Sequence, residues 1–180
     1  MHCTAAVLLA AAGIVSAENL FQGDTGAEAG VEFVTQGGMF KTRVPVFHDT
    51  NVFYEGNGAL RVEWKNKLPP GFRHTYPDRY FGVDMPELER DQEYTVSFYA
   101  KASENDFPVR LDLFTKEGWR KDTSYSSNIR LTTEWKRYSF PFKIKVPKNF
   151  FSTAYSLNIA LLRKNGKTDT ENLWFDAFQL

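Results

Sequence analysis

The closing segment of the chain places a carboxylate where a strand would bury it. The segment ENLWFDAFQL (residues 171–180) has apolar residues at alternate positions, which predicts a strand. These apolar residues are Leu173, Phe175, Phe178 and Leu180. Asp176 lies in the middle of the run. Because an unpaired buried carboxylate costs several kcal/mol, we expect Asp176 to have a hydrogen-bonding partner or a metal ion.

Aromatic side chains form a second group that could act on a ligand. Phe, Tyr and Trp make up 16% of the 180 residues. Phe mostly builds cores, whereas Trp and Tyr also form flat platforms for sugar rings or bases. The 22 basic residues are balanced by 22 acidic residues, so the chain has no excess positive charge of the kind that binds nucleic acid electrostatically. We therefore expect no nucleic-acid partner. The length fits one domain with a substantial core.

The sequence shows no established catalytic motif. His48 and His74 are the only histidines beyond residue 17, and neither has a metal-ligand spacing such as H-E-x-x-H. The chain also lacks the nucleophile motif G-x-S-x-G, a P-loop and the dinucleotide-binding motif G-x-G-x-x-G. We therefore expect a protein that is not an enzyme.

The first residues resemble a secretory signal. Residues 4–15 form an uncharged apolar run, shorter than the about 20 residues that span a bilayer. Val15, Ser16 and Ala17 form a small-x-small site, so we expect a signal peptide over residues 1–17 and a secreted protein. Cys3, the only cysteine, would leave with it. A buried N-terminal helix is the alternative. No later apolar run is long enough for a membrane span, so no membrane partner is expected.

Short strand patterns, and no sustained helical period, fill the rest of the chain. Strands are predicted at 58–64, 79–85, 93–102, 108–115, 127–132, 135–144, 155–163 and 171–180. Clusters of Gly, Pro, Asn and Asp separate them. Many short strands with frequent turn signals indicate an all-β fold, a β-sandwich or barrel, of which a jelly roll is the best single architecture.

Three segments together resemble a known family. They are EYTVSFYAKA (93–102), LTTEWKRYSFPFKI (131–144) and LWFDAFQL (173–180). Their order and spacing are similar to those of carbohydrate-binding modules of families four, nine and twenty-two. DTGAEAG (24–30) and EGNGALRVEW (55–64) resemble the opening motifs of that family, with Ala27 and Ala59 replacing the usual Phe and Ser. The resemblance covers nearly all of residues 18–180, which are expected to form a single β-sandwich module. It implies a galactose-binding-like jelly roll that binds polysaccharide without cleaving it.

The resemblance also implies a structural Ca²⁺ site. In such modules the aspartate of the last strand and the glutamate of the opening motif often share a calcium ion. The matching positions are Asp176 and Glu28, with backbone carbonyls near Gly30 and Gly58, and Asp24 is a further candidate. Ca²⁺ accepts six to eight mixed oxygen ligands, so the set is chemically reasonable. The alternative is a carboxylate satisfied by backbone N–H groups at a β-bulge.

Glycan contacts are expected from exposed aromatic rings with polar side chains beside them. The candidates are Trp119, Tyr99, Trp64, Phe114, Arg110, Asp112, Arg73 and Tyr125. Trp119 is the strongest, because a tryptophan at a hairpin tip is poor for solubility. Several of these residues have an alternative structural role. Trp64 could pack over the end of the core, and Phe114 could pack at its edge. Arg110 and Asp112 could form a solvent-exposed ion pair that contacts no ligand. Trp135 is expected to be structural, and Trp174 could face either way.

The resemblance implies an attached glycoside hydrolase domain, which the module would hold near a β-linked plant or algal glycan. Two alternatives remain. One is an interaction β-sandwich that packs on a catalytic domain and binds no glycan, in which Trp119, Tyr99 and Phe114 would not share one groove. The other is a polysaccharide lyase or hydrolase with a cleft that joins His74, Arg73 and a tyrosine. A basic groove of Arg73, Arg79, Arg110 and Arg120 would favour an acidic or sulfated glycan over a neutral one.

Overall fold

The protein is built from β-strands. The computed structural model describes residues 19–21, 26–28, 34–35, 44, 46–65, 80–115, 124–146, 148, 153–162 and 170–180. The strands within these ranges are β1 (Val34–Thr35), β2 (Val46–Asp49), β3 (Ala59–Lys65), β4 (Tyr80–Asp84), β5 (Glu93–Ala102), β6 (Phe107–Thr115), β7 (Tyr125–Leu131), β8 (Lys136–Lys143), β9 (Tyr155–Leu161) and β10 (Thr170–Gln179). This part of the chain contains no helix that is long and apolar enough to cross a membrane. The expected signal peptide, Gly30, Arg73 and Trp119 lie outside the described residues.

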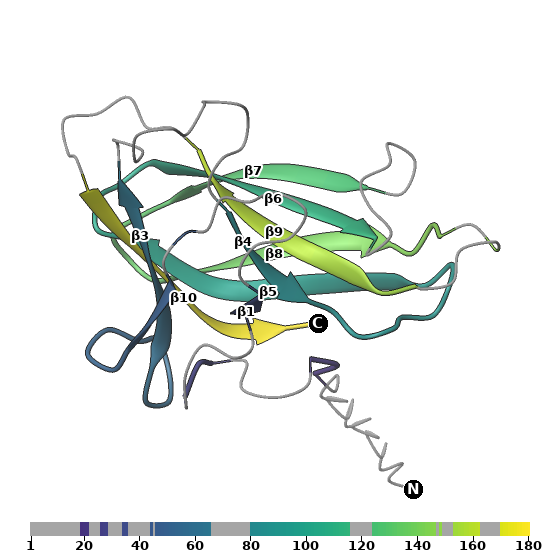
Figure 1. The fold of residues 1–180 in the computed structure, drawn as a ribbon, viewed down its shortest axis with the longest axis horizontal. Coiled ribbons are helices and arrows are strands. Elements are labelled where there is room, and N and C mark those ends of the chain that lie inside the picture. Colours follow the sequence, from purple (N-terminus) through teal and green to yellow (C-terminus); the bar gives the residue numbers. More distant parts are fainter. Residues whose placement is uncertain are drawn as a thin grey trace, which may run out of the picture.

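The strands form two antiparallel sheets that pack face to face (Figure 1). The first, sheet A, has the order β1-β4-β9-β6-β7, and the second, sheet B, has the order β2-β3-β10-β5-β8. Neighbours in each sheet are mostly far apart in sequence, as in a jelly roll. The predicted all-β sandwich is confirmed, and each of the eight predicted segments overlaps one strand, with bounds that differ by up to two residues. β1 and β2 were not predicted.

The core lies between the two sheets and follows the alternation of the strands. On β6, Val109, Leu111 and Leu113 are at most 1% exposed. The rings of Phe81 on β4 and Phe175 on β10 meet edge to face with centroids 4.9 Å apart, which joins the two sheets. Packing of this kind supplies most of the free energy of folding in a domain of this size.

A β-bulge in β10 explains the change of phase in the closing segment. The register of β10 with β5 shifts between Asp176 and Gln179. Ala177 has a φ of 49°, a left-handed conformation that non-glycine residues adopt at a cost. The extra residue allows Phe175 and Phe178 both to point inward, although they are three positions apart, and both are fully buried.

The two ends of the described domain are joined by hydrogen bonds. The backbone N–H of Leu20 donates to the carbonyl of Leu180 at 3.1 Å. The side chain of Asn19 donates from Nδ2 to the carbonyl of Phe178 at 3.0 Å and accepts from the N–H of Leu180 at 3.0 Å. Residues 19–21 are therefore an integral part of the sandwich.

We expect Asn19→Ala to lower the free energy of unfolding by about 1–2 kcal/mol, because it removes side-chain bonds to both Phe178 and Leu180. Chemical denaturation measures this change. Asn51→Ala is the matched control, since Asn51 bonds to Asp49 through its backbone N–H, which the substitution keeps. Equal losses in the two variants would contradict the role of Asn19.

Candidate functional site

The outer face of sheet A carries a row of polar side chains from neighbouring strands. Asp112 on β6 lies opposite Ser126 on β7 and opposite Asn158 on β9, and Asn158 lies opposite Gly82 on β4. The alternation of β6 forces this arrangement, because its odd-numbered residues fill the core and its even-numbered residues point outward. We call this surface the polar row.

Two members of the polar row, Asp112 and Asn158, are shielded although they point away from the core, whereas Ser126 is exposed. Asp112 and Asn158 are each only 7% exposed, and Tyr80 and Ala160, which share this face, are 4% and 0% exposed. Polar side chains tolerate such burial only with partners. The face therefore combines low access to water with fixed polar groups, as sites for small or extended polar ligands do.

Asp112 holds two of its neighbours in position. Its carboxylate accepts from Arg110 Nε at 2.7 Å and from Ser126 Oγ at 2.6 Å. Arg110 is on the same strand and the same face, so its guanidinium is oriented along the sheet surface. A guanidinium fixed in this way is a planar donor that matches adjacent hydroxyl or carboxylate oxygens.

Phe114 adds an aromatic ring to the same face. It lies opposite Ser156 on β9, and its side chain is only partly buried. The Ser156 hydroxyl donates to Asp84 Oδ1 at 3.2 Å, which continues the polar surface onto β4. Arg110, Asp112 and Phe114 were predicted to share one face, and the structure brings them together there.

The other candidate contacts lie elsewhere. Trp64 is 2% exposed and packs edge to face on Phe107, so it belongs to the core and cannot stack on a sugar; its expected contact role is wrong. Tyr125 points between the sheets, where its hydroxyl donates to the Lys143 carbonyl at 2.5 Å. Tyr99 lies on the outer face of sheet B, so it cannot line one groove with Phe114.

Two carboxylates converge at the bulge of β10. Asp176 is fully buried, and Oδ2 accepts from the backbone N–H groups of Tyr54 at 2.8 Å and Glu55 at 3.2 Å. Oδ1 accepts from the N–H of Ala177 at 2.7 Å. Glu28 accepts a very short bond from the N–H of Asn57. The sequence left two explanations for Asp176, a metal ligand or a carboxylate that accepts backbone N–H groups at a β-bulge. The structure shows these N–H contacts.

Glycines allow the two carboxylates to approach. A Cβ on Gly26 would lie 2.9 Å from Glu28 Oε1 and 3.3 Å from Asp176 Oδ1, so both oxygens face this glycine. Gly56 has a φ of 71°, and a Cβ there would lie 1.7 Å from Glu28 Oε1. Sequence reasoning missed Gly26 and Gly56, and the glycine-rich segments around Glu28 and Asn57 were the available signal.

Gly58 lies beside this pair and is required for packing. A Cβ there would lie 2.2 Å from His48 Nε2 and 2.9 Å from the carbonyl oxygen of Ala27. Within the described residues no group of three or more His, Cys, Asp or Glu side chains is placed to hold a metal. A cation here would therefore need backbone oxygens besides Glu28 and Asp176, and Ca²⁺ accepts such mixed sets.

The environment of Asp176 changes its acidity. Burial raises the pKa of its carboxyl above the ordinary 3.8, the three backbone N–H donors oppose this, and the charge of Glu28 raises the pKa further. The net shift of the pKa is upward, so ionising Asp176 is less favourable in the folded protein than in the unfolded chain. A bound cation would remove the repulsion between the two carboxylates.

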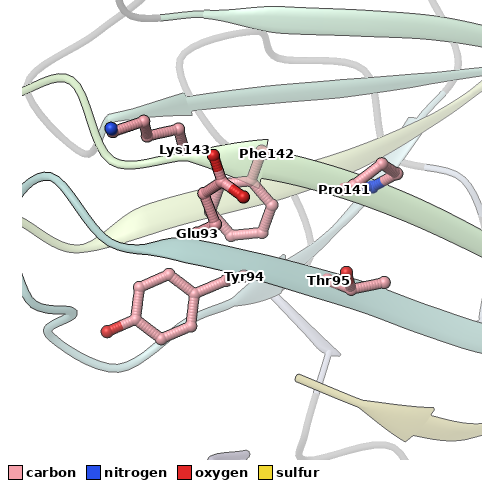
Figure 2. A pocket seen from close by; sticks show the side chains of 6 residues that line it. All are labelled: Glu93, Tyr94, Thr95, Pro141, Phe142 and Lys143. Carbon is pink, nitrogen blue, oxygen red and sulfur yellow. The ribbon is translucent and has the colours of Figure 1, made fainter.

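A separate hollow of about 350 Å³ lies at one end of sheet B, between β5 and β8 (Figure 2). Its lining residues are Glu93, Tyr94, Thr95, Pro141, Phe142 and Lys143. None of them was a candidate contact, and the hollow is on the opposite sheet from the polar row. The geometry of the polar row makes it the better candidate site.

Comparison with solved structures identifies the fold as that of carbohydrate-binding modules. A family 16 carbohydrate-binding module matches with a TM-score of 0.57 and 15% identity over 89% of this chain and 98% of its own. The CBM61 module TmCBM61, solved with β-1,4-galactotriose, gives 0.57 and 15% over 90% and 97%. The CBM22-2 xylan-binding domain of Xyn10C from Paenibacillus barcinonensis gives 0.57 and 15% over 86% and 95%. No family model and no curated protein matches the sequence. The resemblance inferred from the sequence motifs is confirmed at the level of the fold.

Proposed function

We propose that this protein binds a polysaccharide on the outer face of sheet A and does not cleave it. The observation that carries the proposal is the polar row, in which Asp112 and Asn158 are each 7% exposed on an outward face and Asp112 fixes Arg110. Phe114 on the same face offers a ring for the apolar side of a sugar. The arrangement supplies the two elements of glycan recognition, stacking and planar hydrogen bonding.

The proposed ligand is a β-linked plant or algal glycan. Support comes from the fold neighbours, since TmCBM61 is described with β-1,4-galactotriose and the Xyn10C module as xylan-binding. In this proposal the protein is secreted and holds an attached or associated glycoside hydrolase near its substrate. Tethering of this kind raises the effective concentration of substrate at the enzyme.

Affinity gel electrophoresis over xylan, mixed-linkage glucan, laminarin, agar, carrageenan and alginate tests the proposal. We expect one glycan to retard the protein, and Phe114→Ala to lower the affinity about tenfold, which corresponds to roughly 1.4 kcal/mol of lost stacking. Phe53→Ala is the matched control, because Phe53 is 38% exposed and lies in the turn after β2. Retardation that is equally weakened in both variants would contradict the assignment of the face.

An interaction domain without glycan binding is the second candidate. One observation favours it: Tyr99 and Phe114, which were expected to share a groove, lie on the outer faces of different sheets. If the protein is an interaction domain, we expect that none of the six glycans will retard the folded protein in the same experiment. That result would shift the role of the domain to contact with a neighbouring catalytic domain.

We also propose that Glu28 and Asp176 bind a structural Ca²⁺, with backbone carbonyls in the segments around Ala27 and Gly58. The convergence of both carboxylates on Gly26 supports this site. Calcium would neutralise the like charges of the buried Asp176 and the exposed Glu28, which stabilises the folded state through linkage to binding. At a calcium concentration of about 100 times its Kd, the expected stabilisation is about 2.7 kcal/mol.

The stabilisation by calcium should depend on pH. The pKa of Asp176 is raised above 3.8 in the folded state, so the folded protein holds this proton more tightly than the unfolded chain. Without calcium, the contribution of Asp176 to stability therefore falls as the pH rises from 3.8 through the raised pKa. Calcium competes with the proton, so its effect on the melting temperature should grow over the same window.

Thermal denaturation of chelator-treated protein, with and without calcium, measures both effects at mildly acidic and at neutral pH. We expect calcium to raise the melting temperature more at neutral pH, and Asp176→Asn to abolish most of the difference. A melting temperature that calcium leaves unchanged at neutral pH would refute the site.

A further inference from the structure

The outer face of sheet B carries alternating cations and aromatic rings. Trp174 on β10 lies opposite Lys101 on β5 and opposite Arg61 on β3, and Arg61 lies opposite Phe47 on β2. The order across four neighbouring strands is therefore cation, ring, cation, ring. Adjacent strands are about 4.8 Å apart, so the row extends for about 14 Å across the sheet.

One half of this row is neutralised within the protein. Arg61 lies 4.6 Å from the centre of the Phe47 ring and forms ion pairs with Asp49 at 3.3 Å and Glu63 at 2.8 Å. Trp174 Nε1 donates to Asp49 Oδ2 at 2.9 Å. Burial raises the pKa of Asp49, but the bonds from Trp174 and the nearby backbone outweigh it, so its pKa is lowered. Asp49 therefore stays ionised as the partner of Arg61.

Two cations near the other half have no carboxylate partner: Lys101 of the row, and Arg137 on the neighbouring strand β8. Lys101 Nζ lies 5.7 Å from the centre of the Trp174 ring and 6.0 Å from that of Trp135. Arg137 lies 5.7 Å from the Tyr99 ring and donates to the neutral side chains of Ser97, at 2.9 Å, and Gln179. Within the described ranges, the ion pairs of the protein do not include Lys101 or Arg137.

Aromatic rings connect these two cations into one surface. Tyr54 stacks on Tyr99 with ring centroids 3.5 Å apart and an interplanar angle of 12°. Trp135 meets Tyr54 edge to face at 6.1 Å. Tyr54 is 41% exposed, which is unusual for a large aromatic residue in a stacked cluster. We call Lys101, Arg137, Tyr54, Tyr99, Trp135 and Trp174 the basic aromatic patch.

We propose that the basic aromatic patch is a second glycan site and binds a polysaccharide that bears carboxylate or sulfate groups. The reasons are the two cations held over rings without an acidic partner, and the exposed Tyr54 ring beside them. The anion of the ligand would accept from Lys101 and Arg137, and the apolar side of a sugar would rest on Tyr54. Charge-assisted bonds of this kind are stronger than those to neutral hydroxyls.

A neutral glycan would fit this patch less well, because it would cover two cations without neutralising them. The patch lies on the sheet opposite the polar row, so the inference goes beyond the proposed function and does not rest on it.

Affinity electrophoresis in polygalacturonate, carrageenan and neutral mixed-linkage glucan tests the patch at low and high salt. Polygalacturonate carries carboxylates and carrageenan carries sulfates. Comparing retardation by the two polymers therefore shows which of the two anionic groups the patch binds. We expect at least one to retard the protein at low salt, with weaker retardation at high salt. The double variant Lys101→Gln with Arg137→Gln should weaken this retardation about tenfold, as two lost contacts of about 0.7 kcal/mol each would do.

The double variant Lys143→Gln with Lys145→Gln is the matched control, since it removes the same charge from the end of β8 and the residues after it. We expect it to bind the anionic glycan as the unchanged protein does, and circular dichroism checks the fold of both variants. Phe114→Ala on sheet A should leave this binding intact, which separates the patch from the polar row. Equal loss in the two double variants, or no retardation by either anionic polymer at low salt, would overturn the proposal.

Discussion

Asp176→Ala is expected to lower the free energy of unfolding by about 3 kcal/mol at neutral pH. The substitution leaves the backbone N–H groups of Tyr54, Glu55 and Ala177 without their acceptor. An unpaired N–H costs about 1–3 kcal/mol when it is buried, as that of Ala177 is, and less when it is part-buried, as those of Tyr54 and Glu55 are. This loss of stability is partly offset, because the substitution also removes a buried charge that is less favourable in the folded protein than in the unfolded chain. For a domain of this size, the melting temperature should fall by about 6–12 °C.

Asp84→Ala is the control for this prediction. Asp84 is exposed and accepts a bond of 3.2 Å from the Ser156 hydroxyl, so its loss should cost less than about 1 kcal/mol. Urea denaturation of the three proteins gives both differences. If Asp176→Ala proves no more destabilising than Asp84→Ala, Asp176 does not organise the turn after β2.

Arg110→Ala is expected to weaken glycan binding by more than about tenfold, which is the largest effect we expect at the polar row. The variant removes the planar donor and also leaves Asp112 with Ser126 as its bonded neighbour. Arg110→Lys keeps a positive charge near Asp112 but loses the fork of donors. It should therefore retain most of the stability and still bind the glycan weakly. Titration calorimetry measures the affinities, and thermal denaturation measures the stabilities.

Arg130→Ala supplies the comparison within the same sheet. Arg130 pairs with Asp106 at 3.1 Å, and both side chains are more than half exposed. Such pairs contribute little to stability, and Arg130 lies at the outer edge strand β7. An affinity loss in Arg130→Ala that matches the loss in Arg110→Ala would mean that charge, and not the geometry around Asp112, governs binding.

The sequence predicted strands well where a strand has one buried face. β3, β5 and β6 alternate apolar and polar residues, so their inward faces could be assigned from the sequence. β2 was missed because Val46 is its only buried residue, and it is an edge strand with no alternation to detect. The bulge at Ala177 was anticipated only as an alternative, since nothing in the sequence demands a positive φ at an alanine.

The site was harder to predict than the fold, because it depends on which strands are neighbours. Arg110, Asp112 and Phe114 were grouped correctly, since they alternate on one strand. Asn158 and Ser126 were missed, because they join Asp112 only through pairing with β9 and β7. Tyr99 was grouped with Phe114 although it lies on the other sheet. Trp64 was taken as a contact because a strand end does not show whether the ring points into the core.

Nitrogen-15 NMR titration with the neutral glycan that retards the protein most strongly is the most direct test of the sheet A site, because anionic glycans are expected on sheet B. We expect the largest amide shift changes in β6 and β9, around Arg110, Asp112, Phe114 and Asn158, with smaller changes in the outer strand β7. Changes confined to sheet B, or distributed evenly over both sheets, would contradict the claim that the outer face of sheet A is the glycan site.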